Sequence, residues 1–112
     1  MKESNSMSYR IMRIMLFFDL PTESAKQRRN YRLFRRALIN DGFYMLQESV
    51  YCKMAINRTN VDLIKERVKK ICPTEGNVMC LSITEKQFAA IELLCGALDS
   101  KVIANEDKMI IL

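Results

Sequence analysis

The sequence predicts an α+β domain in which two helices cover one face of a four-stranded sheet. Three observations predict this class. Four apolar runs have the length of strands, two longer segments repeat apolar residues at helical spacing, and turn residues separate these segments. With 112 residues, 49% of them hydrophobic, the chain is long enough for one compact domain and too short for two.

The first predicted strand covers residues 11–18, where seven of the eight side chains are apolar. A run of this length is too short for an ordinary helix, and its composition is typical of a central strand that is buried on both faces. Asp19 follows the run directly, and Pro21 turns the chain away from the strand. The sequence therefore places a carboxylate at the end of a buried strand.

The first predicted helix runs from about Glu23 to Asp41. Thr22 and Ser24 are both candidate N-caps, and Gln27 stands three residues after Ser24, as a capping box requires. The helix has an apolar face that we expect to pack on the sheet. This face consists of Tyr31, Phe34 and Leu38, flanked by Leu33 and Ala37.

Basic side chains occupy the other side of the same helix. An arc of roughly 120° contains Arg28, Arg29, Arg32, Arg35 and Arg36. No acidic residue occurs between Ala25 and Asn40, whereas a solvated helix face normally mixes both signs. Together with the net charge of +5, this arginine stripe predicts contact with a nucleic-acid backbone. The alternative is a plain solvated face.

The remaining segments complete the order of elements. Two short strands are expected at residues 43–46 and 50–54, joined by a tight turn or a bulge. Apolar residues at helical spacing predict a second amphipathic helix over residues 61–71, which Pro73 ends. Residues 78–83 form the fourth apolar run of strand length. The order strand, helix, strand, strand, helix, strand is the ferredoxin-like βαββαβ arrangement.

This assignment divides the chain into three parts. We expect a disordered leader at residues 1–8, the ferredoxin-like domain at residues 9–84 and a C-terminal extension at residues 85–112. Residues 84–88 have the pattern of a short capped turn, and residues 91–95 are apolar enough for an additional strand. The apolar chain end, residues 109–112, predicts a terminal strand that docks on a second subunit or another partner.

The cysteines and the absence of histidine restrict the chemistry. Cys52, Cys72, Cys80 and Cys95 lack the paired spacing of metal ligands, and no histidine is present to complete a mixed zinc site. We expect reduced core cysteines in a soluble, cytoplasmic protein, because free cysteine is usually buried and no apolar run is long enough to span a bilayer. Proton transfer near neutral pH then falls to metal-bound water, a carboxylate or a lysine.

Several motifs follow one another along the chain. They are the strand ending Phe17-Phe18-Asp19-Leu20-Pro21, the arginine-rich helix, and Gly42-Phe43 followed by Gln47-x-Ser49-Val50-Tyr51. In this combination residues 7–112 resemble the CRISPR-associated adaptation proteins of the Cas2 family. The segment Thr84-Glu85-Lys86-Gln87-Phe88 is similar to the variant found beside single-effector (type II) systems.

The resemblance implies a homodimer of ferredoxin-like subunits that lies between two dimers of the CRISPR integrase subunit and helps to insert spacer DNA into a CRISPR array. It also implies an endonuclease that acts on RNA or DNA and binds Mg²⁺ near the strand-end aspartate, which is Asp19 in this sequence. The structural motif of the family falls on Gln47, Ser49 and Val50. The resemblance assigns no contact to an individual arginine.

Three functional hypotheses stay open. In the first, the protein is a subunit of the spacer-acquisition complex that binds double-stranded DNA through the five arginines. In the second, it is a Mg²⁺-dependent endonuclease or endoribonuclease, and the Asp19 side chains of two subunits hold the ion across a twofold axis. The alternative for Asp19 is a carboxylate that caps the following turn or helix. The third hypothesis is a ferredoxin-like regulatory module that binds a small ligand. Under all three, Phe43, Tyr51 and Phe88 are expected in the core and not stacked on bases.

Overall fold

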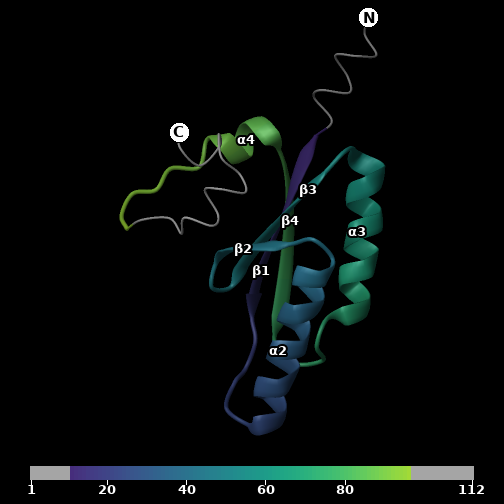
Figure 1. Cartoon of the computed structure of the whole chain (residues 1–112), viewed down its shortest axis with the longest axis vertical. Coiled ribbons are helices and arrows are strands. Elements are labelled where there is room, and N and C mark those ends of the chain that lie inside the picture. The colour runs from purple at the N-terminus through teal and green to yellow at the C-terminus, as the bar shows by residue number, and fades with distance from the viewer. Residues whose placement is uncertain (1–10, 97–112) are drawn as a thin grey trace, which may run out of the picture.

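The computed structural model describes residues 11–96. Its helices and strands (Figure 1) are β1 (Met12–Asp19), α2 (Ala25–Asn40), β2 (Tyr44–Gln47), β3 (Val50–Ala55), α3 (Arg58–Ile71), β4 (Asn77–Thr84) and α4 (Glu85–Ala89). The predicted βαββαβ order is confirmed, and each predicted strand end lies within one residue of the observed end. The expected leader at residues 1–8 and the expected terminal strand at residues 109–112 lie outside the described residues.

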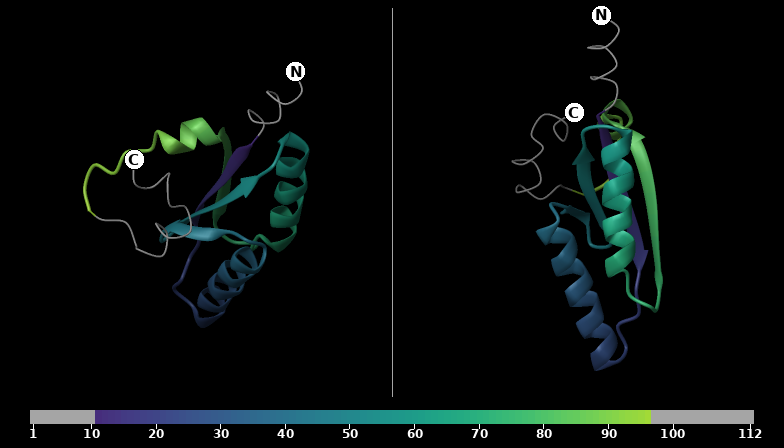
Figure 2. Two further views of the ribbon diagram at one scale, coloured as in Figure 1. Left: turned by 45° about the horizontal axis from the view of Figure 1, so that its top comes forward. Right: turned by 90° about the vertical axis from the view of Figure 1, so that its right-hand side faces the viewer.

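The four strands form one antiparallel sheet in the order β2-β3-β1-β4. Strand β1, the most apolar run of the sequence, lies between β3 and β4, so its predicted central position is confirmed. Helices α2 and α3 lie on the same side of the sheet (Figure 2). This is the ferredoxin-like arrangement that the order of elements predicts.

The sheet face beneath the two helices carries the main apolar core. Alternate residues of β1 point to this side and are buried there: Met12, Ile14, Leu16 and Phe18. The Phe18 ring packs against Phe34 and Tyr51, with centroid distances of 5.2 and 5.4 Å. Phe43, Tyr51 and Phe88 are all buried, which confirms the expectation that these aromatic residues belong to the core.

The opposite sheet face is partly covered by α4. Phe88 packs on Met15 and Cys52 in a second, smaller apolar cluster. Beside this cluster Arg13 of β1 is only 2% exposed, and its guanidinium donates hydrogen bonds to the Glu85 carboxylate at 2.7 and 3.0 Å. Helix α4 is therefore held on the sheet by an ion pair as well as by apolar contact.

Local sequence determines where α2 begins. Ser24 is the N-cap: its hydroxyl accepts a 3.0 Å hydrogen bond from the Gln27 N–H, and the Gln27 side chain accepts one from the Ser24 N–H. The predicted capping box is thus confirmed. The helix starts at Ala25, two residues later than predicted, because Ser24 and not Thr22 provides the cap.

Two further local predictions are confirmed. The pairing of β2 with β3 shifts register between Met45 and Gln47, at the expected bulge. Thr84 caps α4 in a second capping box with Gln87, where the sequence predicts a short capped turn. No helix within residues 11–96 combines the length and the apolar character needed to cross a membrane.

Two expectations are wrong. Residues 91–95 form no strand, and Leu94 is 89% exposed. Apolar composition alone predicted this strand, but a strand also needs a neighbour to pair with. The cysteines are free but do not all lie in the core: Cys52 is buried and Cys72 is half-buried, whereas Cys80 and Cys95 are exposed. Cys80 is exposed because β4 is an edge strand of the sheet that the helices do not fully cover.

Candidate nucleic-acid interface and carboxylate site

Helix α2 presents its arginines to solvent. Phe34 and Leu38 of the apolar face are buried against the sheet, as the helical periodicity predicts. The N-terminal half of the helix extends past the end of the sheet (Figure 1). All five arginines of the stripe are exposed: Arg28, Arg29, Arg32, Arg35 and Arg36.

Two arginines of the stripe form hydrogen bonds within the protein. The Arg28 guanidinium donates to the carbonyl oxygens of Thr22 and Glu23, at 3.1 and 2.9 Å, in the connection between β1 and α2. The Arg35 guanidinium donates a 2.6 Å hydrogen bond to the hydroxyl of Tyr51, a buried residue of β3. This hydrogen bond raises the pKa of Arg35 above its usual value. Both arginines therefore connect α2 to neighbouring elements.

The other three arginines are available to a ligand. Arg29, Arg32 and Arg36 form no hydrogen bond or ion pair with any residue between positions 11 and 96. They occupy positions i, i+3 and i+7, so their side chains lie within about 60° of one another around the helix axis. Each guanidinium offers five N–H donors in a planar fork that matches phosphate oxygens.

Asp19 lies exposed at the end of β1. It pairs with Asn77, the first residue of β4. Its carboxylate forms no hydrogen bond or ion pair within the part of the chain that the structure describes. Because Ser24 caps the following helix, the Asp19 carboxylate is not used as the helix cap and remains available to a ligand.

Gly76 holds the backbone close to Asp19. A Cβ atom at Gly76 would lie 2.7 Å from the Asp19 carbonyl oxygen and 2.8 Å from the Leu20 side chain. The φ angle of Gly76 is +91°, which other residues rarely adopt. Only glycine therefore allows the connection between α3 and β4 to pass so near the candidate site. No residue spacing predicted this contact.

The exposed carboxylate of Asp19 is a ligand of the type that Mg²⁺ prefers. Carboxylate oxygen is a preferred ligand of Mg²⁺, which usually keeps several waters and binds one or two carboxylates together with phosphate oxygens. Within residues 11–96 no three or more His, Cys, Asp or Glu side chains gather around a common point. Within these residues the structure therefore offers fewer than three such ligands at any one place, so a magnesium ion bound here would need water, phosphate oxygens or a further chain to complete its coordination.

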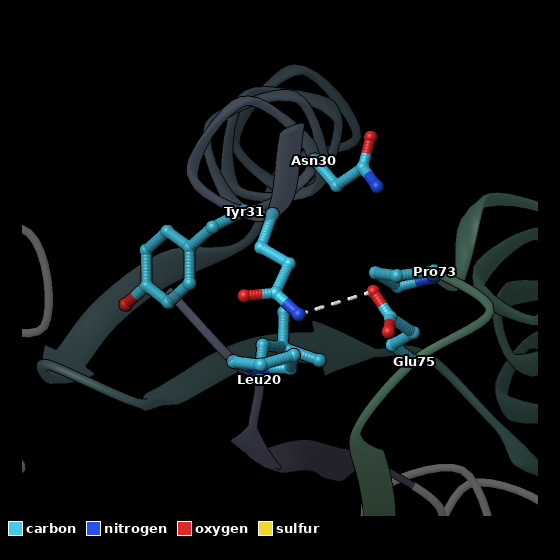
Figure 3. A pocket seen from close by; sticks show the side chains of 7 residues that line it. Leu20, Asn30, Tyr31, Pro73 and Glu75 are labelled. Atoms are coloured by element: carbon cyan, nitrogen blue, oxygen red, sulfur yellow. Dashed lines mark hydrogen bonds between the residues drawn. The ribbon is translucent and has the colours of Figure 1, made fainter. Parts of the chain in front are cut away.

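A shallow hollow lies near the Asp19 end of the molecule (Figure 3). The connection between β1 and α2, the connection between α3 and β4, and α2 itself line this hollow. The lining residues are Leu20, Pro21, Gln27, Asn30, Tyr31, Pro73 and Glu75. The Gln27 amide donates a 3.4 Å hydrogen bond to the Glu75 carboxylate. The hollow encloses about 190 Å³, less than the roughly 300–1,000 Å³ of a typical small-molecule site. The regulatory-module hypothesis gains no support from it.

Asp41, at the C-terminal end of α2, connects this helix with β3 and α3. The sequence did not predict this role, because the partners of Asp41 lie 12 and 26 residues further along the chain. Its carboxylate accepts hydrogen bonds from Arg67 of α3, at 2.9 and 3.1 Å, and from Lys53 of β3 at 3.4 Å. Burial alone would raise the pKa of Asp41, but its contacts with Arg67 and Lys53 outweigh burial and lower this pKa. These ion pairs fix the basic helix relative to the sheet and α3.

The sheet face that carries Asp19 also carries uncovered apolar side chains. Met79 and Leu81 of β4 stand opposite Phe17 and Met15 of β1, so they share a face with Asp19. Met79 is 65% exposed and Leu81 is 49% exposed. We call these two residues the open apolar patch. Uncovered apolar residues grouped in this way indicate a contact surface for another chain.

Comparison with known proteins gives consistent matches over most of the chain. The family model described as "CRISPR associated protein Cas2" matches residues 12–91. The chain is 41% identical over 101 residues to the CRISPR-associated endoribonuclease Cas2 of Treponema denticola, which covers 90% of this chain and 100% of that protein. The protein of the same name from Ligilactobacillus salivarius is 39% identical, with the same coverage.

A solved structure supports the fold. The structure titled "Crystal structure of cas2" superposes with a TM-score of 0.55 at 17% identity and covers 80% of this chain and 92% of that one. At this identity the likeness concerns the fold alone. Because the family model spans the whole sheet, α2 and Asp19, and because the relatives match over nearly the full chain, this chain belongs to the CRISPR associated protein Cas2 family.

Proposed function

We propose that this protein is a cytoplasmic subunit of the CRISPR spacer-acquisition complex, in which its homodimer binds double-stranded DNA and bridges dimers of the integrase subunit. The observation that carries the proposal is the exposed arginine stripe on α2, a helix without acidic residues. Contacts from such a helix go to phosphates, so they position a duplex without reading its bases. This behaviour suits a protein that holds DNA of arbitrary sequence.

Titration of labelled duplex DNA at several salt concentrations tests the proposal. Affinity should fall steeply between about 50 and 200 mM salt, and two duplexes of unrelated sequence should bind with similar affinity. The variant Arg29→Gln/Arg32→Gln should bind more weakly. As a control, Lys69→Gln/Lys70→Gln removes the same charge from α3, whose exposed surface mixes both signs.

The control separates two explanations of any loss. Equal weakening in both variants would show that net charge, and not the stripe, determines binding. If the unaltered protein fails to bind duplex DNA even at low salt, the proposed function is wrong.

A second copy of this chain is the partner that fits the open apolar patch. Two copies that meet by this face about a twofold axis would cover each other's Met79 and Leu81 with the same surface. Asp19 lies on the same face, so this contact would also place both carboxylates at one interface. Such a homodimer would serve both the proposed scaffold and a shared metal site.

The second candidate function is metal-dependent cleavage of RNA or DNA. It is favoured by the exposed carboxylate of Asp19, and the relatives from T. denticola and L. salivarius carry the name endoribonuclease. Asp19 of each subunit would bind Mg²⁺. When bound, this ion polarises a phosphate and lowers the pKa of a bound water. The arginines of α2 would hold the substrate phosphates, and the chain has no histidine to act as a base.

Replacement of Asp19 distinguishes the two functions. Under the cleavage hypothesis, Asp19→Asn abolishes Mg²⁺-dependent cleavage of labelled RNA or DNA, whereas Asp62→Asn at an exposed position of α3 does not. Under the scaffold proposal, the Asp19→Asn dimer still supports spacer acquisition in cells. If acquisition fails although the variant folds and binds DNA, the scaffold role alone is insufficient.

A further inference from the structure

We propose that α2 holds the nucleic acid through a single line of three residues, Arg29, Arg32 and Arg36, whereas Arg28 and Arg35 position the helix and contact no phosphate. This inference rests on the proposed DNA-binding function and assigns its contacts. Three of the five arginines then form the DNA-binding surface of α2, and their ligands are the phosphates of one DNA strand.

Helix geometry places the three residues on one line. Positions i, i+3 and i+7 are separated by about 4.5 and 6 Å along the axis and lie within about 60° around it. The whole line is therefore about 10 Å long, about three times the 3.4 Å rise per phosphate of one strand along the DNA axis. A line of this length and width matches one backbone strand better than it matches both.

The three arginines of the line lose no contact within the described residues when they bind a phosphate. Arg29, Arg32 and Arg36 form no hydrogen bond or ion pair within residues 11–96, so each can turn its fork toward a phosphate without losing an internal contact. Arg28 differs, because its guanidinium already donates to two backbone carbonyl oxygens in the connection that precedes α2. Both hydrogen bonds come from Nη1, so a phosphate contact that uses this nitrogen would compete with the two carbonyl groups.

Arg35 differs more strongly. Its partner, the Tyr51 hydroxyl, belongs to a side chain with 0% exposure, so withdrawal of Arg35 would deprive a buried polar group of its donor. Arg35 also feels the negative charge of Glu48, which would repel a phosphate placed beside it. Arg35 therefore fixes α2 on the sheet and is a positioning residue for the line.

Two variants with equal loss of charge test the assignment. Arg29→Gln/Arg32→Gln removes two members of the line, and Arg28→Gln/Arg35→Gln removes both positioning residues. Glutamine keeps a high helix propensity at all four positions. Binding of labelled duplex DNA is measured across a salt series, and thermal unfolding is measured on the same samples.

The expected results differ for the two variants. Each phosphate contact contributes about 0.9 to the slope of log affinity against log salt concentration. Over the tenfold change in salt from 1 M to 0.1 M, this slope corresponds to an increase in affinity of about eightfold for each contact. Loss of two line residues should reduce the slope by about 1.8 for each bound helix and weaken binding roughly 60-fold at 0.1 M salt, with an unchanged melting temperature. Loss of Arg28 and Arg35 should leave the slope unchanged and lower the melting temperature.

Other outcomes overturn the assignment. An equal reduction of slope in both variants, or no reduction in either, contradicts a line of three contacts. If Arg28→Gln/Arg35→Gln does not fold, Arg28→Gln alone decides, because a slope reduced by about 0.9 would make Arg28 a phosphate contact. Failure of the unaltered protein to bind duplex DNA refutes the proposed function and is recognised before any variant is compared.

Discussion

Glu85→Gln should be strongly destabilising, because it removes a carboxylate that accepts two hydrogen bonds from the buried Arg13 guanidinium. Arg13 is 2% exposed and donates hydrogen bonds to Glu85 at 2.7 and 3.0 Å and to the Tyr44 hydroxyl at 2.9 Å. Its guanidinium also lies 4.6 Å from the centre of the Phe88 ring. One cation thus connects β1 with β2 and α4.

The magnitude follows from burial. Removal of one partner from a fully buried ion pair costs about 3–5 kcal/mol in unfolding free energy. The Glu85 side chain is 34% exposed, so water screens part of this interaction, and glutamine retains one hydrogen-bond acceptor. We therefore expect a loss of about 2 kcal/mol, which corresponds to a decrease in melting temperature of about 8–16 °C for a domain of this size.

Urea unfolding at a fixed protein concentration measures the loss. The control is Glu66→Gln, because the Lys69–Glu66 pair is exposed by 71% and 63% and should contribute less than about 0.5 kcal/mol. Arg13→Met/Glu85→Gln should be more stable than Glu85→Gln alone, since no buried charge then remains. Equal effects at Glu85 and Glu66, or a double variant that is the least stable of all, would refute the reasoning.

Three other predictions concern the site and its support. Because the pKa of Asp41 is lowered in the folded protein, its ion pairs stabilise the fold above about pH 4, and this contribution is lost as pH falls through the folded pKa. The stability of Asp41→Asn in an acid-unfolding series should therefore depend less on pH than that of the unaltered protein. Gly76→Ala should destabilise the protein in urea by about 1–3 kcal/mol, and more than Gly96→Ala, where a Cβ meets nothing within 4 Å. Leu81→Lys should reduce the dimer fraction in sedimentation, whereas Leu63→Lys on α3 should not; equal dimer fractions would contradict an interface at the open apolar patch.

Local patterns were sufficient to predict most of the fold. β1 could be predicted because its residues are apolar on both faces, which only a central strand needs. The start of α2 could be predicted because Ser24 and Gln27 satisfy each other within one helical turn. Residues 91–95 show where such patterns fail, because a strand is defined by its neighbour and not by its own composition.

Contacts between distant residues were not predictable in this way. Arg13 interrupts an apolar run, and its role becomes clear only when Glu85, 72 residues further along the chain, is placed beside it. The helical wheel predicted that five arginines are exposed, but it could not separate bonded from free side chains. Arg35 lies at the end of the arginine arc nearest the apolar face, which was the one sign in the sequence that it could reach the sheet.

The proposed DNA-binding surface and the proposed subunit-pairing surface lie on opposite sides of this molecule. Helix α2 covers one face of the sheet, while Asp19 and the open apolar patch share the other face. The connection between Asp19 and Ala25 spans at most about 20 Å even when extended, so a nucleic acid on the arginine line lies near the Asp19 end. Under the proposed pairing through the open face, the two Asp19 carboxylates would lie at one interface and the arginine line would stay free. A scaffold needs only that line, whereas cleavage needs the line and the paired carboxylates, so loss of Asp19 should remove cleavage and leave DNA affinity unchanged.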